Sequence, residues 1–560
     1  MAREPKPVSA PDDDRRRHRR RSLLAAASIA VAAVLAFHGL DNHKLWDDEA
    51  NTALFGRNLL ATGELSAFDG TNLIGFRGGG ELDENLRNVY MPPLQYWVAA
   101  AGFGLLGEST FTARVPFVLL GLASLALLAV FSRRLLGERF PWWLPVALTA
   151  LSPAWLLYIR NCRYYAPGVF FVLVLLVAFT ARGTRLRDQA FALVGIGGSV
   201  VALFLSNYFN AFAGMSALAC LLALREFRSR GHLVRLAVAL VVSGLMAAHV
   251  WFNLNPFETE NIRADTTAPL ERFFTLLGWQ LAGLGTFEFF PVVLAPLVAL
   301  PLVLRRLAGE RPLAARAAVI AGAMLAAIVA TAATSPQSVS GSMIADMRYL
   351  VPLIVLGAVV TAVVIVLLFR LWKPLAAAMF AIVCFSNLAH LGFLGDENGF
   401  LPPKSPQCTI CRYVIENLED WETSTEKLVG FLKSAPSGHE VLVIPGYMAY
   451  SPMFYRPDLH FCCQLEPDHP VRKDLKMALP AHIWWHRAAP DVGLVSRAPP
   501  RDASGPLWVR GQRMGNYRLA GSVDARPVDT SRPEIPWHAF SAEENARTHY
   551  VPYVVMDIRR

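Results

Sequence analysis

Three consecutive acidic residues, Asp47, Asp48 and Glu49, stand shortly after the first long apolar run of the sequence. Carboxylates beside an apolar phase are costly unless they are solvated, capped, paired or used in chemistry. In a structural interpretation, Asp47 caps a helix over 50–60, and Asp48 and Glu49 stabilise its first turn. In a functional interpretation, Asp48 is a general base, supported by Asp47 and Glu49. The same acids are the candidates for holding a divalent cation, so the need for a metal stays open.

Arginines near the ends of two later apolar runs form a second candidate group. Arg160 and Arg163 end one run, and Arg348 follows Asp346 just before another. Their guanidinium groups could pair with lipid phosphates or with loop acids. They could also form forks for the phosphate of a lipid-linked substrate. With a carboxylate base nearby, such forks suit transfer of a group from a membrane-anchored phosphate to a hydroxyl, because arginines stabilise the charge on the leaving phosphate.

Aromatic residues accompany these charged groups. Tyr96, Tyr164 and Tyr165 are the candidates for contacting the donor or the acceptor in the loops around the acids and arginines. Arg263 and Arg272, in a later loop, are weaker candidates for the donor phosphate.

The composition indicates that a membrane positions these residues. The 560-residue chain is 54% hydrophobic and only 17% charged, whereas soluble domains carry about 25% charged residues. This excludes a single soluble globule, and the aromatic content excludes a disordered scaffold. A net charge of +9 could suggest nucleic-acid binding, but the basic residues lie in short clusters between apolar runs. We therefore expect a polytopic α-helical membrane protein with no nucleic-acid partner.

About eleven apolar runs are long enough to cross a bilayer, which takes about 20 residues of helix. They lie near 22–40, 114–132, 141–159, 165–181, 189–206, 208–224, 234–253, 286–304, 316–334, 350–369 and 374–394. Arginine-rich and arginine-poor loops alternate between them, after a basic cluster at 15–21. The pattern predicts a cytoplasmic N-terminus and, with an odd number of helices, an extracytoplasmic C-terminus. A cleaved signal peptide would remove the first helix and break this alternation.

Three parts of the chain follow from these runs. They are a basic cytoplasmic N-terminus at 1–21, a transmembrane domain at 22–394 with its first outer loop at 41–113, and an extracytoplasmic domain at 395–560. Within the loop, the apolar stretch 94–106 is too short to span, so we expect a juxtamembrane helix with Tyr96 and Trp97 at the interface. The last domain is polar and Pro-rich with strand-like runs such as 440–444, which predicts a mixed α/β fold.

The last domain also holds four of the seven cysteines, namely Cys408, Cys411, Cys462 and Cys463. Their spacing is unusual for a zinc site. In an oxidising compartment disulfides are the favoured interpretation, with the connectivity left open.

Five short motifs occur in order within residues 22–370. They are Trp46-Asp47-Asp48-Glu49-Ala50, Met91-Pro92-Pro93-Leu94-Gln95-Tyr96-Trp97, Ala113-Arg114-Val115-Pro116, Arg163-Tyr164-Tyr165-Ala166 and Arg348-Tyr349-Leu350-Val351-Pro352. The set resembles the polyprenyl-phosphate-dependent glycosyltransferases of the GT-C fold, in the group of lipid A aminoarabinose transferases and protein O-mannosyltransferases. The resemblance implies that Asp48 is the catalytic aspartate and that the donor is a sugar on undecaprenyl or dolichyl phosphate. The aminoarabinose enzymes carry a lysine where this chain has Met91, which argues against the same donor.

The sequence thus predicts an inverting glycosyltransferase, hexosyl or pentosyl, of a bacterial plasma (inner) membrane. Its acceptor would be a hydroxyl of an extracytoplasmic glycan, lipid or protein. An oligosaccharyltransferase-type subunit is disfavoured because Trp484-Trp485 is followed by His486 instead of the aspartate of that signature. A transporter or flippase of a lipid-linked glycan should show paired repeats or charges deep within spans, and neither is evident. A mere membrane anchor would need far fewer spans.

Overall fold

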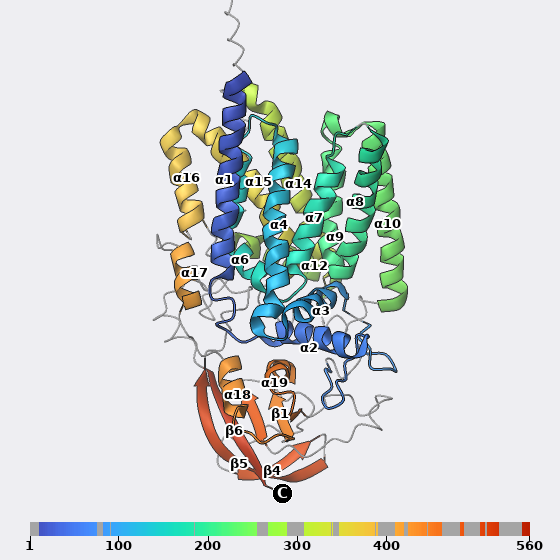
Figure 1. Ribbon diagram of the computed structural model, residues 1–560, viewed down its shortest axis with the longest axis vertical. Helices are drawn as coiled ribbons and strands as arrows, with labels where there is room; N and C mark the ends of the chain where they lie inside the picture. Colours follow the sequence, from blue (N-terminus) through green and yellow to red (C-terminus); the bar gives the residue numbers. More distant parts are fainter. Residues whose placement is uncertain are drawn as a thin grey trace, which may run out of the picture.

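The computed structural model describes most of the chain. The described residues are 11–75, 82–89, 91–183, 185–254, 267–287, 307–335, 337, 339, 347–386, 388–389, 409–418, 424–438, 440–444, 446–461, 482–486, 504–509, 512–525 and 551–559. They form a body of roughly parallel helices, two helices lying across one end of it, and a smaller unit with a sheet beyond them (Figure 1). We call the described part of 395–560 the C-terminal unit.

Six helices among the described residues are long and apolar enough to cross a membrane, and the bent pair α6 and α7 would make a seventh. The six are α1 (Pro11–Phe37), α4 (Thr110–Leu136), α8 (Leu186–Ser206), α10 (Arg230–Leu254), α14 (Arg311–Thr334) and α15 (Val351–Leu371). Each covers one of the runs expected to span, so the chain is a multi-pass membrane protein. α15 is buried along almost its whole length, which places it at the centre of the body.

The expected single helix over 141–159 is wrong. This run forms α5 (Trp143–Ala150) and α6 (Pro153–Arg160). The break has a local cause: a residue before proline is pushed out of the helical region, and Ser152 has φ −82° and ψ 111°. Its Oγ accepts the Trp155 N–H at 3.1 Å and so caps α6.

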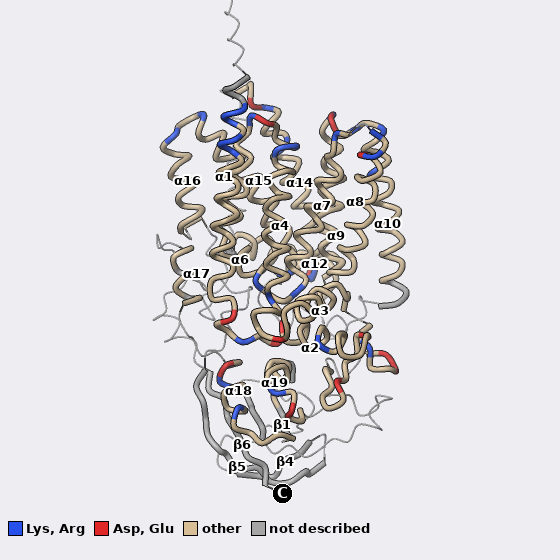
Figure 2. The backbone as a smooth tube through the Cα atoms, viewed as in Figure 1, with Lys and Arg blue, Asp and Glu red and all other residues tan. Residues whose placement is uncertain are grey.

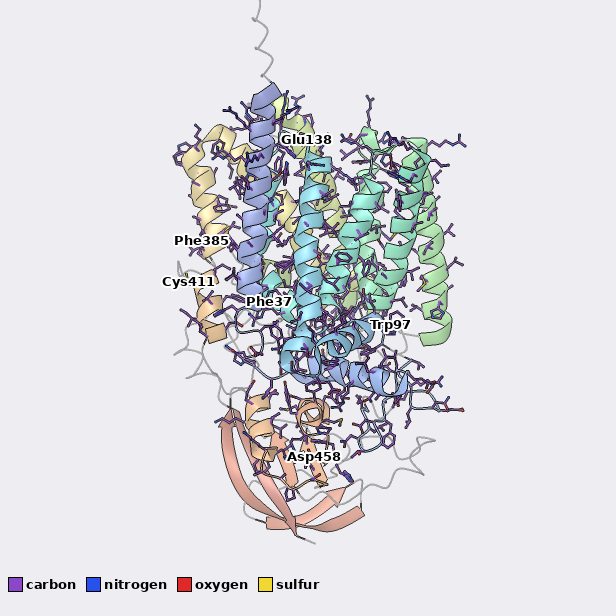
Figure 3. The ribbon with its side chains drawn as sticks, in the orientation of Figure 1. Phe37, Trp97, Glu138, Phe385, Cys411 and Asp458 are labelled. Atoms are coloured by element: carbon purple, nitrogen blue, oxygen red, sulfur yellow. The ribbon has the colours of Figure 1, made fainter. Side chains whose placement is uncertain are left out.

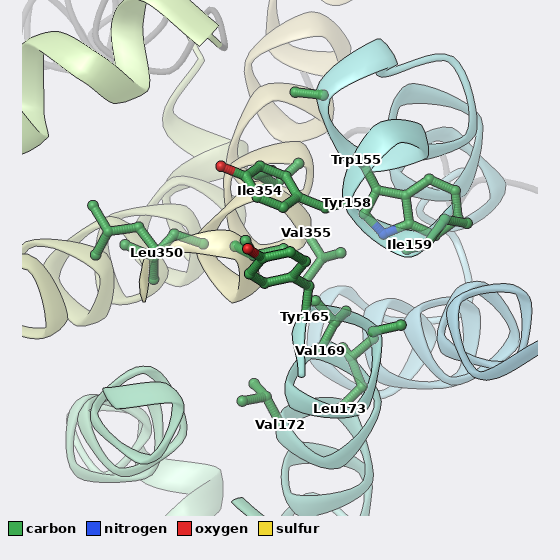
Figure 4. Packing of buried hydrophobic residues seen from close by; sticks show 14 of the residues in the cluster. Trp155, Tyr158, Ile159, Tyr165, Val169, Val172, Leu173, Leu350, Ile354 and Val355 are labelled. Atoms are coloured by element: carbon green, nitrogen blue, oxygen red, sulfur yellow. The ribbon is translucent and has the colours of Figure 1, made fainter. Parts of the chain in front are cut away.

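The next helix, α7 (Tyr165–Phe179), is bent by 108° from α6. Tyr158 of α6 and Tyr165 of α7 pack edge to face, with ring centroids 4.9 Å apart. Leu350, just before α15, and Val355 of α15 lie in the same apolar cluster (Figure 4). The bend is therefore packed into the core of the body.

The remaining elements of the body are shorter. They are α9 (Tyr208–Leu221), α12 (Pro269–Phe287), α16 (Lys373–Phe385) and the 3₁₀ turns η2 (Arg225–Phe227), η3 (Ala308–Glu310) and η4 (Met347–Tyr349). The expected span at 286–304 lies almost entirely outside the described residues.

Two helices, α2 (Asp47–Thr62) and α3 (Leu94–Leu106), lie across one end of the body (Figure 1). Both helices were expected from the sequence and are confirmed. They pack closely because Gly56 has no side chain: a Cβ there would lie 3.0 Å from the Ala99 Cβ. Trp97 is 44% exposed at the edge of this layer (Figure 3), as expected for an interface. Tyr96 was expected there too, but it is fully buried, because it points to the α2 side of α3, where its ring packs on Phe55.

The C-terminal unit holds helices and a mixed sheet. Its elements are α17 (Thr409–Leu418), α18 (Ser424–Leu432), β1 (Glu440–Ile444), η5 (Gly446–Ala449), α19 (Tyr450–Tyr455), β2 (His460–Phe461), β3 (His482–His486), β4 (Ser504–Val509), β5 (Gln512–Ala525) and β6 (Val551–Arg559). The strand order is β2-β1-β3-β6-β5-β4. β1 pairs in parallel with β2 and β3, and the other pairings are antiparallel. The strand expected at 440–444 is confirmed. The disulfide prediction falls mostly outside the described residues, since Cys408, Cys462 and Cys463 are not among them.

Charge separates the two ends of the helical body. Lysines and arginines gather at the end remote from the C-terminal unit (Figure 2). At that end Arg21 donates to the carbonyl of Arg139 at 3.0 Å. Figure 3 shows Glu138 there, far from Asp458 of the C-terminal unit. The N-terminal end of α1 therefore lies at the basic end.

Candidate active site

The Asp48 carboxylate lies between two arginines. Its Oδ2 accepts from Arg163 Nη2 at 3.2 Å and from Arg348 Nη1 at 3.1 Å. The Arg163 side chain is only 4% exposed, whereas Asp48 and Arg348 are each 31% exposed. The structure thus brings together three of the candidate residues from distant parts of the chain, and two of the three remain open to a ligand.

The start of α2 sets the position of Asp48. The helix begins at Asp47, so Asp47 is its first residue and Trp46, not Asp47, is the N-cap. Asp47 Oδ1 instead accepts the Asp48 N–H at 3.0 Å. Acidic residues in the first turn are favoured by the helix dipole, which explains why a run of acids folds as a helix start here.

The break between α6 and α7 sets the position of Arg163. Arg163 Nη1 donates to the Asp48 carbonyl at 3.3 Å and to Thr52 Oγ1 at 3.2 Å. In the same break, Asn161 Oδ1 accepts from Trp46 Nε1 at 2.6 Å. The Arg163 guanidinium also lies over the Tyr164 ring, 5.4 Å from its centroid. A straight helix through 153–179 could not turn these residues toward α2.

Glu49 has a different role from its neighbour. Its carboxylate is fully buried and pairs with Arg114 of α4, at 2.9 Å to Nε and 2.6 Å to Nη2. Glu49 Oε1 also accepts the Cys162 N–H at 2.8 Å. A buried charge pair of this kind must be fully hydrogen-bonded to be tolerated. Glu49 therefore ties α2, α4 and the α6–α7 break together, and it does not face the site of chemistry.

The structure does not bring Arg160 to Asp48. Its guanidinium donates to the carbonyls of Leu35 (3.4 Å) and Gly39 (2.7 Å) at the end of α1 and to Tyr413 Oη at 2.8 Å. Because Arg160 ends α6 before the bend, its side chain points to α1 and α17 instead. Burial raises the pKa of Tyr413, although the positive charge of Arg160 acts to lower it.

The three tyrosines named from the sequence are all buried around Arg163. Tyr96 Oη accepts from Asn88 Nδ2 at 2.9 Å. Burial raises the pKa of Tyr96 well above its ordinary value, so its hydroxyl stays neutral. Tyr164 and Tyr165 pack edge to face with centroids 4.7 Å apart. All three tyrosines thus lie close to Arg163, the buried partner of Asp48.

The remaining candidates lie elsewhere. Arg272 donates to the Gln337 carbonyl at 3.0 Å, whereas Arg263 and Asp346 lie outside the described residues. Within the described part of the chain, no three His, Cys, Asp or Glu side chains converge as a metal site. Asp47, Asp48 and Glu49 therefore do not form one ligand set here.

Two contributors were not identified from the sequence. Arg114 was noted only as part of a motif, although an arginine at the start of an apolar helix requires a partner. Thr52 lies one helical turn after Asp48, and its hydroxyl also approaches Gln95 Oε1 at 3.5 Å. The position of Thr52 on the Asp48 face of α2 was the available signal.

Comparison with known proteins agrees with the motifs. Residues 91–251 match the family model described as dolichyl-phosphate-mannose-protein mannosyltransferase. The resemblance to GT-C polyprenyl-phosphate-dependent glycosyltransferases is confirmed. An uncharacterized protein from Aquifex aeolicus (strain VF5) is 27% identical over 174 residues, which are 30% of this chain. The match spans about a third (32%) of the length of that relative.

Two kinds of solved structure are similar. ArnT from Cupriavidus metallidurans, bound to undecaprenyl phosphate, has a TM-score of 0.48 at 15% identity and covers 82% of this chain and 93% of its own. The archaeal oligosaccharyltransferase AglB from Archaeoglobus fulgidus, in complex with an inhibitory peptide and a dolichol-phosphate, has a TM-score of 0.41 at 10% identity. That match covers 82% of this chain and 69% of AglB.

Proposed function

We propose that this chain is a membrane glycosyltransferase that moves a sugar from a polyprenyl-phosphate donor to a hydroxyl of an extracytoplasmic acceptor. The observation that carries the proposal is the Asp48 carboxylate held between Arg163 and Arg348. A carboxylate base and two guanidinium groups are the parts that such a transfer needs. The family match over 91–251 supports the same class of reaction.

The donor phosphate and Asp48 compete for the same arginines. Guanidinium forks bind phosphate oxygens as well as carboxylates. When the donor is bound, its phosphate takes over the contacts that Asp48 now makes with Arg348 and Arg163. The Asp48 carboxylate is then available to the acceptor hydroxyl. This exchange explains how a carboxylate paired with two cations acts as a base.

One displacement completes the reaction. Asp48 takes the proton of the acceptor hydroxyl while the hydroxyl oxygen forms a bond to the anomeric carbon of the sugar. The bond from that carbon to the phosphate oxygen breaks, and its electron pair leaves with the polyprenyl phosphate. Arg163 and Arg348 stabilise the charge that develops there. A single displacement from the opposite face inverts the anomeric centre.

We infer eleven spans, a cytoplasmic N-terminus and a bacterial plasma membrane. Beyond the six long helices, five further spans are the α5–α6 pair, α7, the shorter apolar helices α9 and α16, and the run at 286–304. The gathering of lysines and arginines at the end remote from the C-terminal unit (Figure 2) supports this orientation, because basic residues stay cytoplasmic. Asp48 then lies at the extracytoplasmic face.

Release of polyprenyl phosphate tests the proposal. The purified chain in lipid nanodiscs would be supplied with undecaprenyl- or dolichyl-phosphate sugars, and the free polyprenyl phosphate measured. We expect release that depends on Asp48. A flippase would move the intact lipid-linked sugar across liposomes without releasing polyprenyl phosphate, so that result would contradict the transferase. Mass spectrometry of lipid-linked sugars and surface glycans in cells lacking the chain would identify the donor and acceptor.

A further inference from the structure

The segment 40–46, which leads into α2, has neither helix nor strand structure. Buried backbone groups outside regular structure need other partners, and the carbonyls of this segment find theirs in the helical body. Arg114 donates to the carbonyls of Leu40 at 2.8 Å, His43 at 3.0 Å and Lys44 at 3.2 Å. One side of the segment is therefore fixed by α4.

Two amide groups of the same segment find their partners in the C-terminal unit. The Lys44 N–H donates to Glu426 Oε1 of α18 at 2.8 Å. The Leu45 N–H donates to Tyr455 Oη at the end of α19 at 2.9 Å. The segment that leads to Asp48 is thus hydrogen-bonded from both sides, by Arg114 of the body through three of its carbonyls and by the C-terminal unit through two of its amides.

Tyr455 is anchored for this role. Its hydroxyl also hydrogen-bonds Thr110 Oγ1 at 2.6 Å, at the start of α4 and one turn before Arg114. The Lys44 ammonium lies 4.6 Å from the centroid of its ring. Burial raises the pKa of Tyr455 to about 12, so the neutral hydroxyl donates and accepts at any physiological pH.

Glu426 acts on the neighbouring amide. Its side chain is 12% exposed, and its Oε1 lies 3.8 Å from Nδ1 of the buried His43. The two positions, Lys44 and Leu45, immediately precede Trp46, which is itself held by Asn161 in the α6–α7 break. A shift of either amide would therefore be passed to the start of α2.

We propose that Glu426 and Tyr455 are positioning residues that fix the backbone before Asp48, so that the C-terminal unit helps to set the position of the candidate base. This inference rests on the proposed transferase function. A misplacement of about 1 Å at a reacting group can lower a rate by about 100-fold, so even a small loosening of the segment would slow transfer. Arg163 and Arg348 lie on other elements, so binding of the donor phosphate would change little.

Other contacts between the C-terminal unit and the first loop provide a matched control. Tyr450, on the same helix as Tyr455, donates its hydroxyl to the Gly75 carbonyl at 2.8 Å. Tyr450→Phe removes one buried tyrosine hydroxyl from α19, whose acceptor, the Gly75 carbonyl, lies outside the segment 40–46. Tyr455→Phe removes the other, which holds the Leu45 amide.

The test combines amide hydrogen exchange with kinetics on the full chain in nanodiscs. In Tyr455→Phe, exchange of the Leu45 amide should rise about tenfold, since one hydrogen bond is lost. The kcat for transfer should fall about tenfold, with the donor KM changed by less than about twofold. In Tyr450→Phe, the Leu45 exchange and kcat should both stay at wild-type values.

A second pair of variants keeps the test decisive if Tyr455→Phe does not fold. Glu426→Gln keeps an oxygen acceptor for the Lys44 amide, whereas Glu426→Ala removes it. Exchange at Lys44 should therefore rise in Glu426→Ala and stay low in Glu426→Gln. Unchanged exchange at Lys44 and Leu45 in all these variants would overturn the positioning role, and so would an equal loss of kcat in Tyr450→Phe and Tyr455→Phe. If the wild-type chain transfers no sugar, the proposed function fails. Hydrogen exchange at Lys44 and Leu45 would then still show whether Glu426 and Tyr455 fix the backbone before Asp48.

Discussion

Asp48 and Arg348 are 300 positions apart in the sequence, and their side chains meet at 3.1 Å. Arg348 comes from η4, just before the central helix α15, while Asp48 comes from the first turn of α2. Arg163 reaches the same carboxylate from the α6–α7 break. The candidate site therefore depends on three segments that only the complete helical body brings together, and each can be tested separately.

Replacing Asp48 should separate chemistry from binding. In Asp48→Asn we expect transfer to fall by about 100- to 10,000-fold, the usual contribution of a general base. Donor binding should be equal or tighter, because the two guanidinium groups lose a competing anion. Turnover and donor affinity, the latter by isothermal titration calorimetry, check this. Asp47→Asn is the control and should keep most of the activity. Full activity in Asp48→Asn would remove Asp48 as the base.

Replacing Arg348 should weaken binding of the donor without destabilising the fold. Arg348 is 31% exposed and hydrogen-bonds Asp48, so Arg348→Ala should fold and raise the donor KM about tenfold through loss of a charge-assisted contact. Arg160→Met is the contrast. It should lower the melting temperature by freeing α1 and α17 but leave the donor KM near wild type. A large rise in the donor KM in Arg160→Met but not in Arg348→Ala would show that Arg160, and not Arg348, binds the donor.

The Glu49–Arg114 pair should control stability. Removing one partner of a buried ion pair typically costs about 3–5 kcal/mol, so Glu49→Gln and Arg114→Met should each lower the melting temperature sharply. The double variant should be less destabilised than the sum, since each single change leaves one charge buried without its partner. Thermal unfolding in detergent followed by circular dichroism measures all three. Additive losses would show that the two groups act independently.

Alkaline pH should loosen the contact of Tyr455 with the first loop. The pKa of Tyr455 is raised from 10.0 to about 12 by burial. The stability that this buried neutral hydroxyl contributes is complete below about pH 10 and is lost as the pH rises toward 12. Melting temperatures between pH 8 and 11 should fall less steeply in Tyr455→Phe than in the wild type above pH 10. Parallel curves for the two proteins would contradict this assignment.

Chelation tests the open question of a metal. Glu49 is taken by Arg114 and the Cys162 amide, so a cation at this site would have at most Asp47 and Asp48 of the three acids. We therefore expect transfer to persist, within about twofold, after treatment with EDTA, because two arginines supply the positive charge. Loss of activity restored by one divalent cation would show that a metal is required.

The sequence predicted the charged residues of the site better than their partners. Asp48, Arg163 and Arg348 could be selected because charged groups beside apolar runs need a reason to be there. Arg160, three residues before Arg163, met the same criterion but lies against α1, since the bend between α6 and α7 sends the two side chains in different directions. A bend of that size depends on tertiary packing, which short-range patterns do not report.

Local signals also explain which elements were predicted. Helix α2 was predicted from the acids at its start, α3 from its apolar composition and short length, and strand β1 from its strand-like run of residues. The break at Ser152 could have been predicted from the pair Ser152-Pro153. A residue before proline disfavours the helical conformation, serine is a good helix cap, and proline is favoured at the first position of the next helix. Tyr455 had no such signal, because its role depends on the docking of the C-terminal unit onto residues 410 positions earlier.

The contact between Leu45 and Tyr455 has a consequence for the order of biosynthesis. The two residues are 410 positions apart, so at 5–20 residues per second roughly 20 to 80 s separate their synthesis on the ribosome. In the proposed orientation the first loop is already exported during that interval, but the Lys44 and Leu45 amides lack their final acceptors. A nascent chain would therefore hold most of its helices in the membrane before the backbone that precedes Asp48 is fixed. With Tyr455 in the proposed positioning role, transfer would reach its full rate only once the C-terminal unit has been synthesised and has folded.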